Sequence, residues 1–305
     1  MYLHCYFESQ CKTLPSVDLI DIAVQSHIRI SNYSSDHLTS YIYLLEQIKN
    51  NGSEHLEKAH SVYVKNTNLQ RHGESFARCL SGMTNLSRIE ISNCSMSSIT
   101  CFIVSHMKQL RCLEYVELVE CQLSGADIQH IAASFSNVST LVLSENQALS
   151  RSGKFWHDLK EMKNLKNLDT RDCSLTKEDM KYISMSVSDM PNLVELNLSG
   201  NATHGRSGES RLLLTEMKHL KKLDVSDCSL MAEDVRHITV SMPNLEELNL
   251  HGNRFIGDST SQWGNLMQIT KHLKKLNMGY CSLTAKDVEH IAVSMPNLEE
   301  LNIPG

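Results

Sequence analysis

Three stretches in the last third of the sequence repeat one frame of spaced leucines, and this frame constrains the fold more than any other feature. Leu220, Leu245 and Leu273 each open the pattern L-x-x-L-x-L-x-x-(Cys or Asn), with Val or Met at some leucine positions, at spacings of 25 and 28 residues. A fixed period of roughly 20–29 residues with this frame is typical of a solenoid with one strand and one helix per repeat. The spaced apolar residues fill a core, and the residues between them face outward. We therefore expect one elongated stack of interdependent repeats.

The frame can be followed back through most of the chain. From residue 59 onward, each repeat supplies a predicted strand centred on one apolar residue: Val62, Ile89, Val116, Leu141, Leu168, Leu196, Leu223, Leu248, Leu276 and Leu301. Residues 1–58 keep the pattern in blurred form, with a short strand at 27–30 and a capped amphipathic helix beginning at Ser35-Asp36. Degenerate terminal repeats are expected because an end repeat faces water on one side. The domain prediction is a degenerate N-terminal cap over 1–58 and regular repeats over 59–305, about twelve repeats in all.

Two repeat types alternate strictly from Leu113 onward. The compact Cys-type repeats predict a helix behind a capping signal, a Ser or Thr three residues before an Asp. These pairs are Ser124/Asp127, Thr176/Asp179 and Thr284/Asp287. The Asn-type repeats carry longer polar connections, such as 201–211 and 253–264, and loops on a rigid scaffold are where recognition residues tend to lie.

The alternation of Cys-type and Asn-type repeats over residues 59–305 resembles the ribonuclease-inhibitor class of leucine-rich repeats. The phrasing LEELNLHGN followed by LKKLNMGYCSLT is similar to the C-terminal sensor arrays of NLR proteins, the nucleotide-binding leucine-rich-repeat receptors of innate immunity. The resemblance implies an α/β horseshoe solenoid with a parallel β-sheet on the concave face and helices on the convex face. It also implies protein–protein recognition, as ligand sensing or autoinhibition, in the cytoplasm.

NLR receptors also carry a P-loop ATPase, but no G-x-x-x-x-G-K-[ST] motif occurs here, and Gly153-Lys154-Phe155 does not match one. The frame also breaks off at Pro304-Gly305. We therefore expect the repeat portion of a larger receptor, truncated at its C-terminus, that binds a protein ligand or another domain of that receptor. Two alternatives remain open. One is a free-standing inhibitor or scaffold resembling ribonuclease inhibitor, and the other is the repeat domain of a GTPase-activating protein or ubiquitin-ligase subunit.

Charge, hydropathy and glycosylation motifs limit the class of partner and the cellular compartment. The formal charge of −6 comes from 35 acidic and 29 basic residues spread along the chain, so nucleic acid is not favoured as a partner. No apolar run is long enough to span a membrane, and Met1–Phe7 is too short for a signal-peptide core. Seven N-x-S/T sequons are the feature that argues for secretion instead.

The cysteines at the end of the frame can be tested by geometry. Cys173, Cys228 and Cys281 lie two strands apart, so roughly 10 Å separates them, beyond the ~7 Å limit for a disulfide. They are expected to be reduced and buried. Cys94 and Cys121 lie in adjacent repeats, so a bridge between them remains open.

No motif indicates catalysis or a cofactor. The sequence has no C-x-x-C pair and no G-x-S-x-G elbow. His130, His237 and His290 each follow an Asp by three residues, but this recurrence without a third converging group indicates surface pairs on helices and no metal site. We expect no enzymatic activity, cofactor or metal.

The outward-facing strand positions form columns across the repeats. One column alternates in charge, which is consistent either with a docking stripe or with a self-neutralising ladder. Its members are Glu195, Lys222, Glu247, Lys275 and Glu300, and Lys221, Glu246, Lys274 and Glu299 repeat the alternation. The next column is amide or acidic and could accept hydrogen bonds from a partner or form a stacked ladder within the sheet. Its members are Asp169, Asn197, Asp224, Asn249, Asn277 and Asn302.

Partner contacts are predicted at these columns and in the loops. On the concave face, Tyr115, Arg171 and His251 break the regularity of the columns and are the preferred contact residues, with Asn197, Asp224, Asn249 and Asn277 beside them. In the loops, Arg206, Arg254 and Trp263 are candidates, since aromatic and Arg side chains are enriched at interfaces. Trp156 occupies a position matching that of Trp263, so packing against a helix is the alternative role for both tryptophans.

Overall fold

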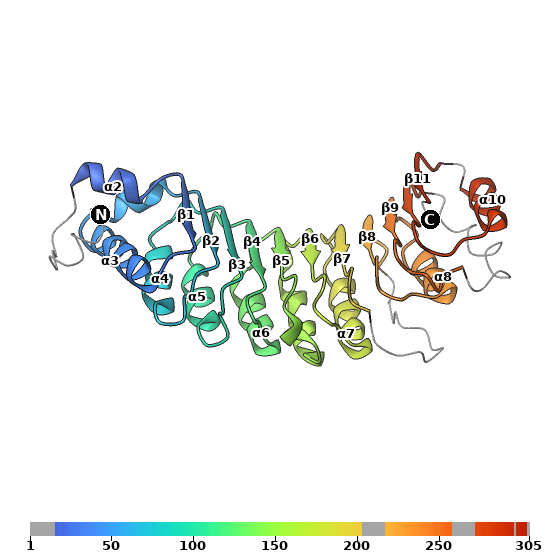
Figure 1. Cartoon of the computed structure of the whole chain (residues 1–305), viewed down its shortest axis with the longest axis horizontal. Coiled ribbons are helices and arrows are strands. Elements are labelled where there is room, and N and C mark those ends of the chain that lie inside the picture. Colours follow the sequence, from blue (N-terminus) through green and yellow to red (C-terminus); the bar gives the residue numbers. More distant parts are fainter. Residues whose placement is uncertain (1–15, 203–216, 258–271, 296, 304–305) are drawn as a thin grey trace. The chain divides into compact units, whose positions relative to one another are not determined.

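A computed structural model describes residues 16–202, 217–257, 272–295 and 297–303. The chain divides into two compact units, Met1–Val142 (unit 1) and Leu143–Gly305 (unit 2). Each unit builds a parallel sheet from one strand per repeat, and the described residues supply eleven strands in total (Figure 1). Within these residues no helix is both long and apolar enough to cross a bilayer.

In unit 1 the strands pair in parallel in chain order (blue to green in Figure 1). They are β1 (His27–Ser31), β2 (Ser61–Lys65), β3 (Arg88–Ser92), β4 (Tyr115–Val119) and β5 (Thr140–Val142). The helices are α2 (Val17–Ala23), α3 (Ser35–Gly52), η1 (Ser53–Lys58), α4 (Gly73–Leu80), α5 (Thr100–Met107) and α6 (Gly125–Ser134).

Unit 2 repeats the arrangement with shorter strands, again paired in parallel in chain order. They are β6 (Asn167–Asp169), β7 (Glu195–Asn197), β8 (Lys222–Asp224), β9 (Glu247–Asn249), β10 (Lys275–Asn277) and β11 (Glu300–Asn302). The helices are η2 (Gln147–Leu149), η3 (Gly153–Glu161), α7 (Lys177–Ser188), α8 (Ala232–Ser241) and α10 (Ala285–Ser294).

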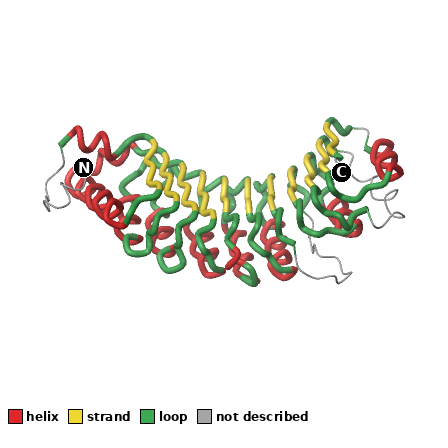
Figure 2. The backbone as a smooth tube through the Cα atoms, in the orientation of Figure 1, coloured by secondary structure: helices red, strands yellow, loops and turns green. Residues whose placement is uncertain are grey.

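The frame leucines fill the core between strands and helices. Leu196, Leu223, Leu248 and Leu276 are each less than 5% exposed, whereas Leu301 is 39% exposed because no repeat within the described residues follows β11. In each unit the helices lie on one side of the strands (Figure 2). The other side, which we call the open face, is left for the outward-facing side chains.

The short strand and the amphipathic helix predicted near the N-terminus are both present. The strand at 27–30 is β1, and the amphipathic helix is α3, whose apolar side chains are buried. The helix cap, however, is Ser34, whose hydroxyl accepts a hydrogen bond from the N–H of His37. Ser34 rather than Ser35 caps the helix because it lies three residues before that N–H in an extended conformation.

The asparagine at the frame end holds the turn that follows each Asn-type strand. Asn253 is fully buried, and its Oδ1 accepts hydrogen bonds from the N–H groups of Cys228 and Leu230 at 3.0 and 2.9 Å. Its Nδ2 donates to the carbonyls of Val225 and Leu250 at 2.9 and 2.7 Å. One side chain therefore satisfies backbone groups in two consecutive repeats.

Cysteine replaces asparagine in alternate repeats, and its thiol is a weak donor that lies near one carbonyl in an earlier repeat and one two residues before it. The Sγ of Cys173 lies 3.2 Å from the carbonyl of Leu143, and the Sγ of Cys281 lies 3.1 Å from that of Leu250. The eight cysteines in the described part of the chain are all free thiols, so Cys94 and Cys121 form no disulfide. Burial raises the pKa of the Cys173 thiol to about 12, which keeps it protonated and unreactive.

Candidate functional site

The open face of unit 2 carries the charged column predicted from the sequence, and its members contact one another. The Nζ of Lys222 lies 2.9 Å from a carboxylate oxygen of Glu195 and 3.8 Å from one of Glu247. Lys275 reaches Glu300 at 3.0 Å. The geometry is that of a self-neutralising ladder along neighbouring strands.

Removing one cation from this ladder should change stability little. We expect Lys222→Ala to lower the free energy of unfolding by less than about 1 kcal/mol, because exposed ion pairs are screened by water and salt. Denaturation in urea at low and at high salt measures the difference, with Lys181→Ala on the exposed surface of α7 as the control. A loss several times larger that persists at high salt would contradict the ladder interpretation.

The amide and acidic column of unit 2 is also occupied by contacts within the sheet. Asn249 donates through Nδ2 to Asp224 at 2.8 Å, and Asn197 donates to Asp169 at 3.3 Å. Burial raises the pKa of Asp169. The Oδ1 of Asn277 accepts from the N–H of Gly279 at 3.1 Å, which shapes the end of the strand. The stacked-ladder interpretation thus describes the structure, and a partner would meet these side chains already ordered.

The residues that break the regularity in unit 2 lie at the strand ends. Arg171 is exposed, and its Nε lies 4.0 Å from a carboxylate oxygen of Asp169. The ring of His251 packs edge-on against Tyr280, with ring centroids 5.2 Å apart, and Tyr280 is 60% exposed. His251 and Tyr280 together present an aromatic surface, of which only His251 is predicted from the sequence.

The open face of unit 1 differs from that of unit 2 because arginine and tyrosine side chains stack on it. Arg88 lies over the ring of Tyr115 on the next strand, with its Cζ 3.4 Å from the ring centroid. Arg29 lies 5.3 Å from the ring centroid of Tyr63 in the same way. The Tyr115 hydroxyl donates to Glu117 at 2.7 Å, and burial together with this hydrogen bond raises the Tyr115 pKa to about 12. Tyr and Arg, with Trp, are the side chains enriched at binding hot spots.

Other predicted contact residues lie in or beside the connections. Arg254 is exposed in the turn that follows β9, and Trp156 is fully buried in η3, as its packing role requires. Arg206 and Trp263 lie outside the described residues. Elsewhere in the described chain, no three His, Cys, Asp or Glu side chains are grouped so that they could hold a metal ion.

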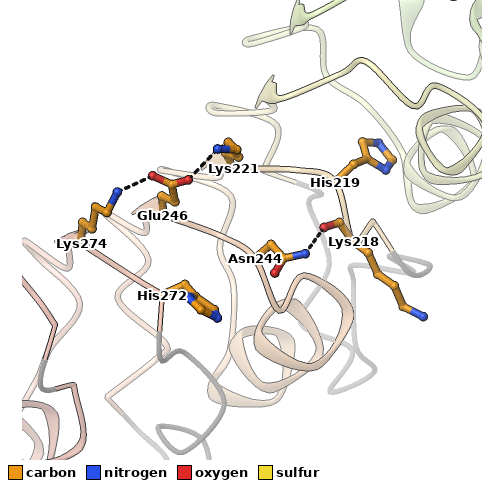
Figure 3. Close-up of a pocket in the computed structure, with 7 residues that line it drawn as sticks. All are labelled: Lys218, His219, Lys221, Asn244, Glu246, His272 and Lys274. Carbon is orange, nitrogen blue, oxygen red and sulfur yellow. Dashed lines mark hydrogen bonds and ion pairs between the residues drawn. The ribbon is translucent and has the colours of Figure 1, made fainter.

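A recess lies at the edge of unit 2 where β8, β9 and β10 begin (Figure 3). Its volume is about 360 Å³, and we call it the basic recess after its lining residues, Lys218, His219, Lys221, Asn244, Glu246, His272 and Lys274. Glu246 lies between Lys221 and Lys274, at 2.8 and 2.7 Å from their Nζ atoms. Asn244 donates to the backbone carbonyl of Lys218 at 2.6 Å.

The charge alternation in the sequence predicts Lys221 and Lys274 as members of a docking stripe or a ladder, and it does not single out Lys218. The available signal was the segment K-H-L-K-K, which occurs at 218–222 and at 271–275 on either side of P-N-L-E-E at 243–247. Because one strand separates the two copies, residues from both copies line the same recess beside Glu246.

Comparison with known proteins agrees with this architecture. The Leucine Rich Repeat family profile matches residues 244–266. The crystal structure of an internalin from Listeria monocytogenes has a TM-score of 0.58 at 17% identity, covering 94% of this chain and 68% of that one. The chain is a leucine-rich-repeat array. Its fold is one that serves protein–protein recognition.

The array is similar in sequence to curated proteins of two groups. NLR family CARD domain-containing protein 4 of Rattus norvegicus is 26% identical over 201 residues, which is 65% of this chain and 19% of the relative. Ribonuclease inhibitor of Sus scrofa is 26% identical over 202 residues, 62% of this chain and 44% of that protein. The chain thus matches less than half of either relative's length. The array is similar to the ribonuclease-inhibitor type and to the repeat region of NLR proteins, as the sequence motifs predicted.

Proposed function

We propose that the array is the ligand-sensing or autoinhibitory region of a cytoplasmic NLR-like receptor, and that it binds a protein partner on its open faces. The observation that carries the proposal is the open face, where ordered polar, aromatic and charged side chains stand on a rigid sheet. Such a surface binds through many contacts at little cost in side-chain entropy. The likeness to an NLR family protein supports the receptor setting, and the free thiols of the described cysteines suit a reducing compartment.

A second candidate is a free-standing inhibitor, because the array matches a larger share of ribonuclease inhibitor than of the NLR relative. The coding sequence upstream of the array separates the two: a P-loop module supports the receptor, and its absence supports the inhibitor. If that sequence encodes a signal peptide, the cytoplasmic setting is wrong.

Binding to the partner tests the open face directly. If a P-loop module is found, it is expressed separately and its affinity for the array is measured by titration. We expect Arg88→Ala/Tyr115→Ala in unit 1 or Arg171→Ala/His251→Ala in unit 2 to weaken binding about ten-fold or more, since each pair removes Arg and aromatic contacts.

The matched control is Gln129→Ala/His130→Ala on the exposed surface of α6, which should leave affinity unchanged. Equal affinity for the wild-type array and both open-face variants would remove the open faces as the binding site. Circular dichroism of each variant confirms that the array remains folded.

A further inference from the structure

The basic recess concentrates positive charge on a chain that is acidic overall. Its three lysines and one glutamate give a net charge of +2 with both histidines neutral, against −6 for the whole chain. Burial lowers the pKa of His219, so its ring adds no charge at neutral pH. A local reversal of sign of this kind attracts anions and raises their association rate.

The contacts of Glu246 show that two lysines of the recess can bind one carboxylate. Its carboxylate bridges Lys221 and Lys274, each of which donates a charge-assisted hydrogen bond (Figure 3). These two contacts hold the pKa of Glu246 at about 2, well below its usual value, so the bridge persists at neutral pH. A carboxylate from another molecule could make the same two contacts.

The bridge leaves the recess open. About 360 Å³ remains beside Glu246, which is within the size range of sites for small ligands or a few side chains. Figure 3 shows Lys218 apart from the Lys221–Glu246–Lys274 row, with its side chain extended away from that row. The flexible stems of Lys221 and Lys274 allow their ammonium groups to follow a ligand.

We propose that the basic recess binds an acidic peptide segment of a protein partner. The carboxylates of the peptide replace that of Glu246 as the partners of Lys221 and Lys274. The identity of the partner as a protein rests on the proposed function, but the binding chemistry does not. Carboxylate is favoured over phosphate because a carboxylate, that of Glu246, already fits between two of the lining lysines. Glu246 then acts as an internal competitor that sets the affinity.

The test uses the full chain and a dye-labelled peptide of five glutamates, followed by fluorescence anisotropy at low salt. Lys221→Gln/Lys274→Gln should weaken binding about ten-fold, and Glu246→Gln should strengthen it about three-fold by removing the competitor. Binding should also fall steeply as salt is added.

The matched control is Lys163→Gln/Lys166→Gln, the same charge change at the entry of β6, which lies outside the recess. It should leave peptide affinity within about two-fold of the wild type. Equal weakening by the control pair, or no strengthening by Glu246→Gln, overturns the proposal. The four substituted lysines are exposed and Glu246 is half-buried, so each variant is expected to fold. Thermal denaturation checks this.

Two further measurements distinguish carboxylate binding from phosphate binding, and the recess proposal from the proposed function. A phosphoserine peptide of equal charge that binds about ten-fold tighter than the glutamate peptide overturns the assignment to carboxylates. If the peptide fails to bind while a protein partner still binds through the open faces, the recess proposal falls and the proposed function stands. If the peptide binds but the open-face variants keep full partner affinity, the proposed function loses its site and the recess remains.

Discussion

Replacing Asp179 by alanine is expected to lower the free energy of unfolding of unit 2 by about 4 kcal/mol, because several buried donors lose a charged acceptor together. Asp179 is fully buried at the start of α7. Its carboxylate accepts from the N–H and hydroxyl of Thr176 at 2.9 and 2.6 Å. It also accepts from the N–H groups of Arg151 and Gly153 in the preceding repeat, at 2.8 and 2.6 Å.

The contacts to the preceding repeat explain why the effect should be so large. Arg151 and Gly153 both have positive φ angles, +64° and +52°, and the arginine pays conformational strain there that these hydrogen bonds offset. This turn leads into η3, which buries Trp156. Loss of Asp179 therefore frees the turn and loosens the packing of η3 against α7.

Asp287 provides the matched control. It caps α10 with the same two contacts to Thr284, at 2.7 and 2.6 Å, and no contact to an earlier repeat is found for it within the described residues. We expect Asp287→Ala to cost about 2 kcal/mol. Urea unfolding is followed by Trp156 fluorescence in a Trp263→Phe background, and equal losses for the two variants would contradict the role of the inter-repeat bonds.

Replacing Asn253 by alanine is expected to destabilise unit 2 by about 3–4 kcal/mol, since the N–H groups of Cys228 and Leu230 lose their acceptor in a buried turn. Two backbone carbonyls lose a donor at the same time. The measurement is the free energy of unfolding in urea, together with hydrogen exchange at those two N–H groups, which should speed up selectively.

Cys173→Ala is the comparison for the asparagine. Cys173 holds the same frame position in an earlier repeat, but its thiol is a weak donor, with the carbonyls of Leu143 and Arg171 at 3.2 and 3.5 Å as its acceptors. Its removal should cost about 1 kcal/mol, mostly through lost packing. If both substitutions cost the same, the asparagine network contributes less than its hydrogen bonds suggest.

The strands, helices and their caps could be predicted because each depends on residues close together in the chain. Ser124, Thr176 and Thr284 do lie at the starts of helices with Asp as the reciprocal partner, as the three-residue spacing predicts. The helix after Leu230 begins in the same way, but Met231 replaces the hydroxyl residue, so only Asp234 bonds back to the Met231 N–H. The signal for this helix was therefore weaker in the sequence.

The candidate site was predicted less completely. The column positions of Asn197, Asp224, Asn249 and Asn277 follow from the two-residue period of a strand. Their pairing does not follow, because which amide reaches which carboxylate depends on side-chain conformations across neighbouring strands. Tyr115 was singled out as an irregularity, but its stacking partner Arg88 lies 27 residues earlier and was not.

The sequence by itself determined the repeat, the strand in each repeat and the side of each strand that is buried, because a leucine frame has one arrangement in which all its apolar residues leave water. Only the tertiary structure decided which residues of different repeats meet. The four-donor site of Asp179 and the basic recess both join residues about 25 to 55 positions apart, and unequal connections separate their repeats. Those contacts depend on how the repeats stack, which local spacing does not encode.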